Sequence, residues 1–258
     1  MSWLDLTFPV TLTADGRTVL FTEENTNLGP MYSACVRATD GSPPVRLGDG
    51  SAQDLSPDGK WALAIVPSKP ERVVLYPLGP GQTKTVETGP VIAYESAAFF
   101  PDGKTLLLCG HESGRGVRCY AQSISGGKPR PVTPEDRSLG TVSSDGRRIL
   151  TLGPAGLEVY PSDGGAGTPV PGSQPGDIPL RWGADGRSVL AVRDWEVPIR
   201  IERLDLATGR RALVRTVGPA DLTGVVQAFP IIVSADEKSY AYTDRRYRSL
   251  LFLVEGLK

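Results

Sequence analysis

The sequence predicts an all-β fold built from six repeated units, arranged as a β-propeller. A turn of the form Ser/Ala/Pro-Asp-Gly-Lys/Arg recurs along the whole chain, and an apolar run follows it, as in "SPDGKWALA" and "FPDGKTLLL". Successive turns are 43, 44, 43, 40 and 51 residues apart, which divides the 258 residues into six units. The acidic residues of these turns are Asp15, Asp58, Asp102, Asp145, Asp185 and Asp236.

The recurring turn has a local physical basis. An Asp carboxylate can accept hydrogen bonds from backbone N–H groups just ahead of it, and Gly adopts a positive φ without steric cost. The sixth copy has Glu237 where the other five have glycine, so we expect that turn to differ.

Each unit reads as four antiparallel strands. The run after the turn, such as "WALAIV", is apolar at every position, which is typical of a strand buried on both faces. A later strand ends in a glycine turn, as at Gly126-Gly127, and a short outer strand such as "PVRLG" completes the unit. A β-helix is the alternative all-β array, but its repeat is far shorter. The 23 prolines and 30 glycines disfavour helices.

The two ends of the chain predict how the ring closes. The sixth unit supplies three strands and ends at Lys258, whereas residues 2–8 precede the first strand of the first unit. We expect Trp3–Phe8 to pair beside Leu250–Val254 as the outer strand of the last blade, because a propeller with unjoined ends leaves open sheet edges. The predicted fold is thus a six-bladed β-propeller of four-stranded blades, one domain over residues 1–258, with the N-terminal strand closing the last blade.

Composition limits the classes of partner. Lys plus Arg number 28 and Asp plus Glu 29, so no global field attracts nucleic acid or an anionic membrane surface. The sequence has no run of eighteen apolar residues that could span a membrane, and its first residues do not match a secretory signal. We expect a monomer that is cytoplasmic as it stands, or a domain cut from a longer and membrane-anchored protein.

The inventory of catalytic and metal-ligating residues is small. His111 is the only histidine, and the nucleophile motif Gly-x-Ser-x-Gly is absent. Cys35, Cys109 and Cys119 make an odd, low count, and we interpret Cys109 and Cys119 as small buried residues that could be neighbours. The spacing of Cys109, His111 and Cys119 matches no familiar zinc pattern. We therefore expect no catalysis, no metal and no cofactor.

The repeated "SPDGK/R" turn followed by an apolar strand resembles the PD40, or WD40-like, repeats of TolB-type six-bladed propellers, over the whole chain. The ends, "SWLDLTFPVTLTADGRTVLFTEE" and "SYAYTDRRYRSLLFLVEGLK", together with "LDLATGRR", look like the propeller that follows the kinase domain in bacterial eukaryotic-like Ser/Thr kinases. That resemblance implies a non-catalytic sensor or interaction module. The chain itself contains no His-Arg-Asp loop and no Asp-Phe-Gly.

Strand direction sorts the loops onto two faces. The Asp-Gly turns and the glycine turns fall on one face, which we call the tight-turn face. The loops between second and third strands and the links between blades fall on the other, which we call the irregular face. Because irregular loops on a rigid scaffold commonly carry function, we expect a protein or peptide partner, or a small ligand at the channel mouth, to bind there. The candidate residues are Glu23, Glu24, His111, Glu112, Arg115, Asp194, Trp195, Glu196, Arg245, Arg246 and Tyr247.

Two functional hypotheses follow. The first is a binding scaffold, such as a sensor or protein-interaction module. The second is a propeller hydrolase of the lactonase kind, with a site at the channel mouth. Such an enzyme requires a metal or a nucleophile held by convergent carboxylates and histidines, and a single histidine weighs against it.

Overall fold

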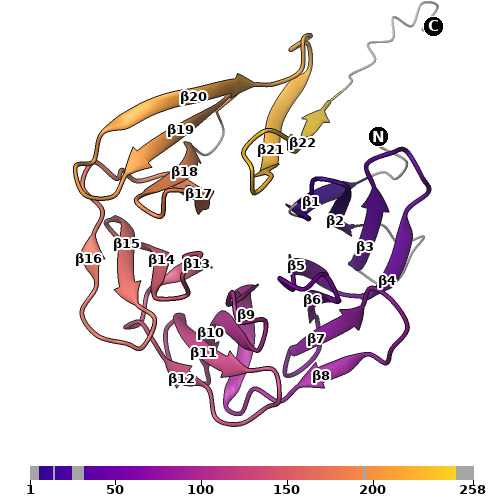
Figure 1. Ribbon diagram of the computed structural model, residues 1–258, viewed down its shortest axis with the longest axis vertical. Helices are drawn as coiled ribbons and strands as arrows, with labels where there is room; N and C mark the ends of the chain where they lie inside the picture. The colour runs from indigo at the N-terminus through magenta and orange to yellow at the C-terminus, as the bar shows by residue number, and fades with distance from the viewer. Residues whose placement is uncertain (1–5, 14, 25–31, 194–195, 248–258) are drawn as a thin grey trace, which may run out of the picture.

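The computed structural model describes residues 6–13, 15–24, 32–193 and 196–247. Every regular element in these ranges is a β-strand, and the strands form small antiparallel sheets set around a ring (Figure 1). The described residues contain no helix long and apolar enough to cross a lipid bilayer.

Five blades have four strands each, in sequence order from the centre of the ring outward (Figure 1). The first has β1 (Thr7–Leu12), β2 (Thr18–Glu23), β3 (Ser33–Ala38) and β4 (Val45–Asp49). The second has β5 (Ser51–Leu55), β6 (Trp61–Val66), β7 (Arg72–Pro77) and β8 (Lys84–Val86). The third has β9 (Val91–Phe99), β10 (Thr105–Glu112), β11 (Arg118–Ser123) and β12 (Arg130–Pro131). The fourth has β13 (Ser138–Val142), β14 (Arg148–Gly153), β15 (Gly156–Pro161) and β16 (Thr168–Pro169). The fifth has β17 (Asp177–Trp182), β18 (Ser188–Arg193), β19 (Ile199–Asp205) and β20 (Arg211–Val217).

The expected count of six four-stranded blades is wrong. After the fifth blade, the described residues form only a two-stranded sheet, β21 (Val225–Val233) with β22 (Tyr240–Arg246). The segment expected to add a third strand, Leu250–Val254, lies outside the described residues. The turn repeat counts copies of a strand–turn–strand unit, and it does not by itself count complete blades.

The prediction that residues 3–8 close the last blade is also wrong for Thr7 and Phe8. Thr7 and Phe8 belong to β1 and pair with Glu23 and Thr22 of β2, inside the first blade. The buried carboxylate of Glu23 holds this register, because it accepts hydrogen bonds from the Leu6 N–H (3.1 Å) and the Thr7 hydroxyl (2.7 Å). The remaining residues of the expected strand, 3–5, lie outside the described residues.

The Asp-Gly turns are as predicted. In the second blade, Asp58 accepts hydrogen bonds from the Ser56 hydroxyl (2.6 Å) and the Lys60 N–H (3.1 Å), and these bonds hold the pKa of Asp58 below its usual value. Gly59 has a φ of 67°, in the left-handed region that favours glycine. The sixth turn was expected to differ, yet Glu237 adopts nearly the same conformation, with a φ of 59°. Its carboxylate is ion-paired with Arg203 of β19.

The apolar second strands form the core between blades. Leu63 of β6 and Leu75 of β7 pack in one buried cluster with Leu106 and Leu108 of β10. These four side chains have no exposed surface, which corresponds to about 1.5–3 kcal/mol of stabilisation for each. The prediction of strands buried on both faces is confirmed for β6, β10 and β18, whereas β22 of the sixth sheet is only partly buried.

Side-chain hydrogen bonds cross every junction between neighbouring sheets. Each joins a side chain on one sheet to a backbone group on the next, so the sheets are tied by polar contacts as well as by apolar packing. The bonds are Ala52 N–H to Thr22 Oγ1 (2.9 Å), Phe99 N–H to Asp54 Oδ2 (2.8 Å), Arg130 to Ser162 O (2.9 Å), Arg148 to Gly186 O (2.6 Å), Arg181 to Val233 O (3.2 Å) and Thr243 to Thr7 O (2.5 Å). The last bond joins the sixth sheet to the first blade, and the Arg245 guanidinium lies 5.0 Å from the Phe8 ring centroid at the same junction.

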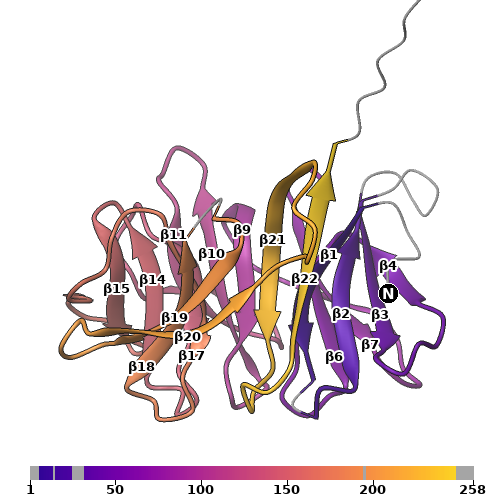
Figure 2. The ribbon, with the colours of Figure 1, turned by 90° about the horizontal axis from the view of Figure 1, so that it is seen from above.

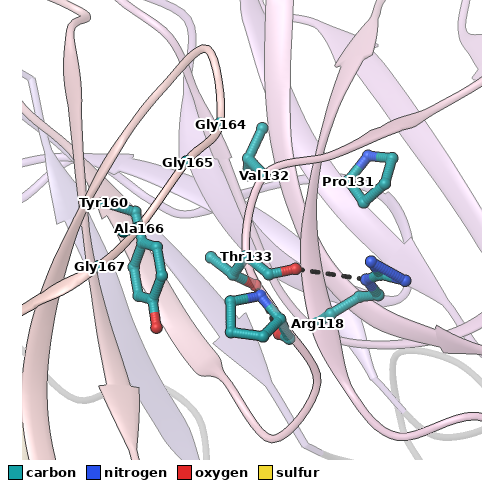
Figure 3. A pocket seen from close by; sticks show the side chains of 10 residues that line it. Arg118, Pro131, Val132, Thr133, Tyr160, Gly164, Gly165, Ala166 and Gly167 are labelled. Carbon is teal, nitrogen blue, oxygen red and sulfur yellow. Dashed lines mark hydrogen bonds between the residues drawn. The ribbon is translucent and has the colours of Figure 1, made fainter.

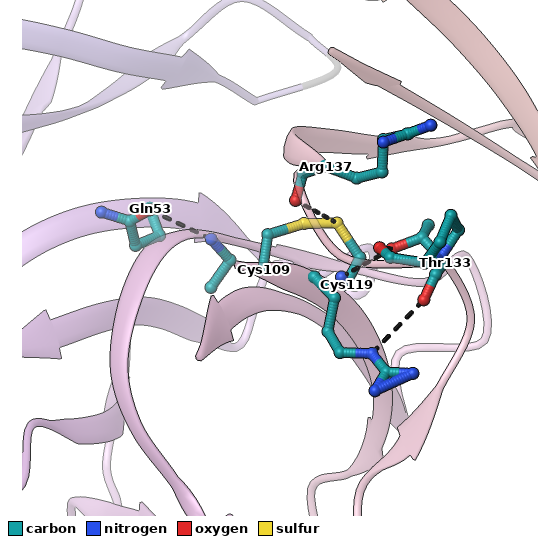
Figure 4. The surroundings of a disulfide bond; sticks show 8 residues. Gln53, Cys109, Cys119, Thr133 and Arg137 are labelled. Carbon is teal, nitrogen blue, oxygen red and sulfur yellow. Dashed lines mark hydrogen bonds between the residues drawn. A yellow bond between two sulfur atoms is a disulfide. The ribbon is translucent and has the colours of Figure 1, made fainter. Parts of the chain in front are cut away.

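Cys109 and Cys119 are the buried neighbours that the sequence allowed, and beyond that interpretation they form a disulfide bond (Figure 4). They face each other directly in the β10–β11 register, and this places their side chains within bonding distance. Both are fully buried and pack against β13 of the fourth blade at Gly140, where a Cβ would lie 2.8 Å from Cys109 Sγ. Cys35 is buried and free.

Candidate functional site

The two faces are arranged as predicted. Each inner strand runs from the irregular face to the tight-turn face, so the Asp-Gly turns gather at one end of the ring and the loops and links at the other (Figure 2). Large apolar side chains are exposed mainly at the irregular end of the described residues. Five of them lie at that end, namely Ile92, Leu139, Leu222, Val226 and Tyr247. Two others, Val45 and Tyr240, lie at the opposite end, and Leu213 and Val214 lie on β20.

The exposed apolar side chains of the irregular face are most numerous at the sixth sheet. Leu222 is 48 % exposed, Val226 46 % and Tyr247 75 %. Backbone hydrogen bonds bring their chain segments side by side, because the Val225 N–H donates to Leu222 O (3.1 Å) and the Tyr247 N–H donates to Gly224 O (2.9 Å). We call Leu222, Val226 and Tyr247 the apolar cluster.

Two predicted arginines flank the apolar cluster. Arg246 donates to Asp244 (2.7 Å) and lies 3.8 Å from Asp221, so its charge is shared between two carboxylates. Arg245 lies over Phe8 at the junction with the first blade, and its Nε is buried without a hydrogen-bond partner among the described residues. Arg245, Arg246 and Tyr247, which the sequence analysis selected as binding candidates, therefore lie beside an exposed apolar surface.

Other predicted residues have structural partners. Glu23 is fully buried and binds the backbone of the segment before β1, so it presents no surface to a ligand. Glu24 donates its N–H to Leu6 O (3.0 Å). Asp194 and Trp195 lie outside the described residues, and Glu196 beside them is 4.0 Å from Arg200.

A second predicted group lies at the end of β10. Glu112 accepts a hydrogen bond from the Tyr120 hydroxyl (3.2 Å) and pairs with Arg115 at 3.8 Å. Arg115 also pairs with Glu135 of the next link at 3.4 Å, and its side chain is 55 % exposed. His111 Nδ1 lies 3.2 Å from the Glu112 carbonyl oxygen. The structure thus brings His111, Glu112 and Arg115 together, and the charges of Glu112 and Arg115 are partly neutralised by their ion pair.

The sequence analysis missed Leu222 and Val226. They lie in a link and at the start of an inner strand, where an apolar residue is expected to be buried. Val226 is the second residue of β21, which with β9 is one of the two nine-residue inner strands, against five or six residues for β1, β5, β13 and β17. No local signal in the sequence distinguishes these two residues from buried ones.

Asp54, on the inner strand β5, is the most perturbed carboxyl group. Burial raises its pKa from 3.8 to about 6, although the N–H groups of Phe99 and Leu55 donate to it at 2.8 Å and favour the ionised form. Both of its oxygens serve the backbone. Among the described residues, no group of three or more His, Cys, Asp or Glu side chains is arranged to hold a metal ion.

The perturbed Asp54 predicts a pH dependence. Its pKa is higher in the folded chain than in the unfolded one, so the folded state keeps a proton that the unfolded state has lost, and stability falls as pH rises from about 4 to 6. Asp54→Asn cannot ionise, so its free energy of unfolding relative to the parent should rise across that window and then level off. Urea denaturation of both proteins at several pH values measures this. A difference that stays constant with pH contradicts the assignment.

No protein-family model matches the chain, and no curated protein sequence matches it. Solved structures do match. TolB from Acinetobacter baumannii is 17 % identical with a TM-score of 0.66, and the match covers 90 % of this chain and 64 % of that one. A chain of a nidogen/laminin complex is 14 % identical with a TM-score of 0.61, over 81 % of this chain and 79 % of that one. Oligogalacturonate lyase from Vibrio parahaemolyticus is 13 % identical with a TM-score of 0.59, over 89 % and 68 %.

The chain is thus an all-β propeller of four-stranded antiparallel blades. More particularly, its fold is TolB-like. At these identities the likeness is one of fold alone, and the chain spans less than two thirds of the length of TolB from Acinetobacter baumannii.

Proposed function

We propose that this propeller is a non-catalytic binding scaffold that holds a protein or peptide partner on its irregular face. The observation that supports the proposal best is the apolar cluster of Leu222, Val226 and Tyr247, flanked by Arg245 and Arg246. Tyr and Arg are enriched among the residues that dominate interface energies, and apolar contact with a polar rim is the usual anatomy of an interface.

The wider role that we propose is that of a sensor or interaction module in a larger signalling protein. It rests on the resemblance of "SWLDLTFPVTLTADGRTVLFTEE" and "SYAYTDRRYRSLLFLVEGLK" to the propellers that follow bacterial Ser/Thr kinase domains. A propeller of similar fold occurs in a nidogen/laminin complex, which supports binding as a use of this architecture.

The competing function is an enzyme, since a propeller of similar fold is an oligogalacturonate lyase. The one observation in its favour is the raised pKa of Asp54, because perturbed carboxyl groups gather at catalytic sites. Against it, both Asp54 oxygens accept backbone hydrogen bonds, which leaves the group a structural role. Metal analysis and a panel of hydrolase and lyase substrates separate the two functions.

Tyr247→Ala is expected to weaken partner binding by about thirtyfold, the effect of losing one dominant interface side chain. The partner is first trapped by a photo-crosslinking amino acid placed at position 222, then purified and titrated against the folded propeller. Tyr240→Ala is the matched control, because Tyr240 is an exposed tyrosine at the other end of β22, on the tight-turn face. Both variants should keep the parent melting temperature. If Tyr240→Ala weakens binding and Tyr247→Ala does not, the partner binds the opposite face and the proposal is wrong.

A further inference from the structure

A cavity of about 390 Å³ lies on the outer side of the ring, between the third and fourth blades (Figure 3). Its walls come from Arg118 at the start of β11, from the segment 131–134 that leaves β12, and from Tyr160 and Gly164–Gly167 around the β15–β16 turn. It is remote in sequence from the apolar cluster and independent of the function proposed above. Its volume falls at the small end of the range for ligand sites.

Arg118 is the only charged residue in the wall of this cavity. Its Nε donates to Thr133 O at 3.4 Å, and its guanidinium lies 5.7 Å from the Tyr120 ring centroid. Within the described ranges it pairs with no carboxylate, since none of the ion pairs there includes it. The cavity therefore offers one positive charge with free N–H donors.

Three carboxylates on the elements around the cavity are already bound by other residues. Glu112 and Glu135 both pair with Arg115, at 3.8 and 3.4 Å. Glu158 pairs with Arg137 at 2.7 Å and also accepts a hydrogen bond from the Tyr160 hydroxyl. These three carboxylates have partners and Arg118 forms no ion pair within the described ranges, so the charge of Arg118 is open to a group that comes from outside.

The rest of the wall is mostly apolar. Pro131, Val132, Pro134 and the ring of Tyr160 line it, and the turn beside Tyr160 is packed closely, since a Cβ on Gly167 would lie 2.4 Å from the ring. The Tyr160 hydroxyl is occupied by Glu158 and Arg137, so the ring contributes contact area rather than a free hydrogen-bonding group.

We propose that this cavity binds a ligand that carries one carboxylate on an apolar body, with the carboxylate held by Arg118. A planar guanidinium matches a carboxylate with two parallel hydrogen bonds, and the prolines and Tyr160 cover the apolar part. Two sources provide this chemistry, namely the C-terminal residue of a peptide and a free aryl or alkyl acid.

Ligand-observed NMR with four probes tests the proposal. The probes are 3-phenylpropionate and N-acetylphenylalanine, which represent a free acid and a chain end, and the amide of each. Both carboxylates should bind about tenfold more tightly than their amides, because an ionised acceptor strengthens the hydrogen bonds from the guanidinium. Tighter binding of N-acetylphenylalanine than of 3-phenylpropionate identifies a chain end as the ligand, and the reverse order identifies a free acid.

Arg118→Gln should abolish this preference for the carboxylate, whereas Arg118→Lys should keep part of it. Arg147→Gln is the matched control, since Arg147 is an exposed arginine on the tight-turn face and its loss removes the same charge. Melting curves verify that each variant is folded. The proposal is overturned if the amides bind as well as the acids, if Arg118→Gln keeps the preference, or if the parent protein shows no binding up to about 10 mM.

Discussion

Arg211→Ala is expected to lower the free energy of unfolding by about 3–5 kcal/mol, because it leaves a buried carboxylate without its cation. Arg211 pairs with Asp177, which has no exposed surface, and with Glu202 at 3.0 Å. It also donates to Gly172 O at 3.1 Å. After its loss, the partners that Asp177 keeps among the described residues are the Gln174 N–H at 2.7 Å and the more distant Arg193 at 3.8 Å.

The neighbouring arginine provides the control for this prediction. Arg210 is exposed and has no side-chain partner among the described residues, so Arg210→Ala should change the free energy of unfolding by less than about 0.5 kcal/mol. Urea denaturation measures both variants. The double variant Arg211→Met, Asp177→Leu should recover much of the loss, since a buried ion pair can be replaced by apolar residues at little cost. If Arg211→Ala is as stable as Arg210→Ala, the ion pair of Arg211 with Asp177 does not contribute to the free energy of unfolding.

Replacing both Cys109 and Cys119 by alanine is expected to cost about 2–3 kcal/mol. The bond closes a loop of ten residues within one hairpin, and its removal frees that loop in the unfolded chain. Because folded domains are stable by only about 5–15 kcal/mol, the loss should be evident in urea denaturation.

Thiol counting tests the same bond directly. Alkylation of the denatured chain should label one cysteine without reductant and three with it, and Cys35→Ala should label none without reductant. In the folded chain Cys35 should react slowly, since burial raises the pKa of its thiol to about 11. Three labelled cysteines in the unreduced chain mean that the disulfide does not form.

The sequence predicts those parts of the fold that depend on local chemistry. The Asp-Gly turns need only their own residues, so the turn at Asp58 and the apolar strand after it could be placed without the structure. The N-terminal strand could not be placed, because the need to close the ring does not say which sheet edge receives residues 3–8. A buried carboxylate sixteen residues further on, Glu23, binds Thr7 and decides the pairing.

The candidate site was predicted only in part, for a similar reason. Tyr247, Arg245 and Arg246 could be selected by residue type and by their place in an irregular loop. Leu222 and Val226 could not, since an apolar residue in a link or at the start of an inner strand is expected to be buried, and only the structure shows that these two are exposed. The disulfide required the register of β10 against β11, a one-residue precision that the turn pattern does not provide.

The polar bonds across the blade junctions have a consequence for how the molecule unfolds. A linear array of repeats can fray from its ends, because each repeat contacts only its neighbours and the terminal ones are least supported. Here the contact of Thr243 with Thr7 gives the first and last sheets a neighbour on both sides, as every other sheet has. Losing one sheet removes two junctions at once, so no sheet can melt at the cost of a single boundary. The ring should therefore unfold as one cooperative unit, with hydrogen-exchange protection of similar size in β6, β10 and β18, rather than as a graded loss from either end of the chain.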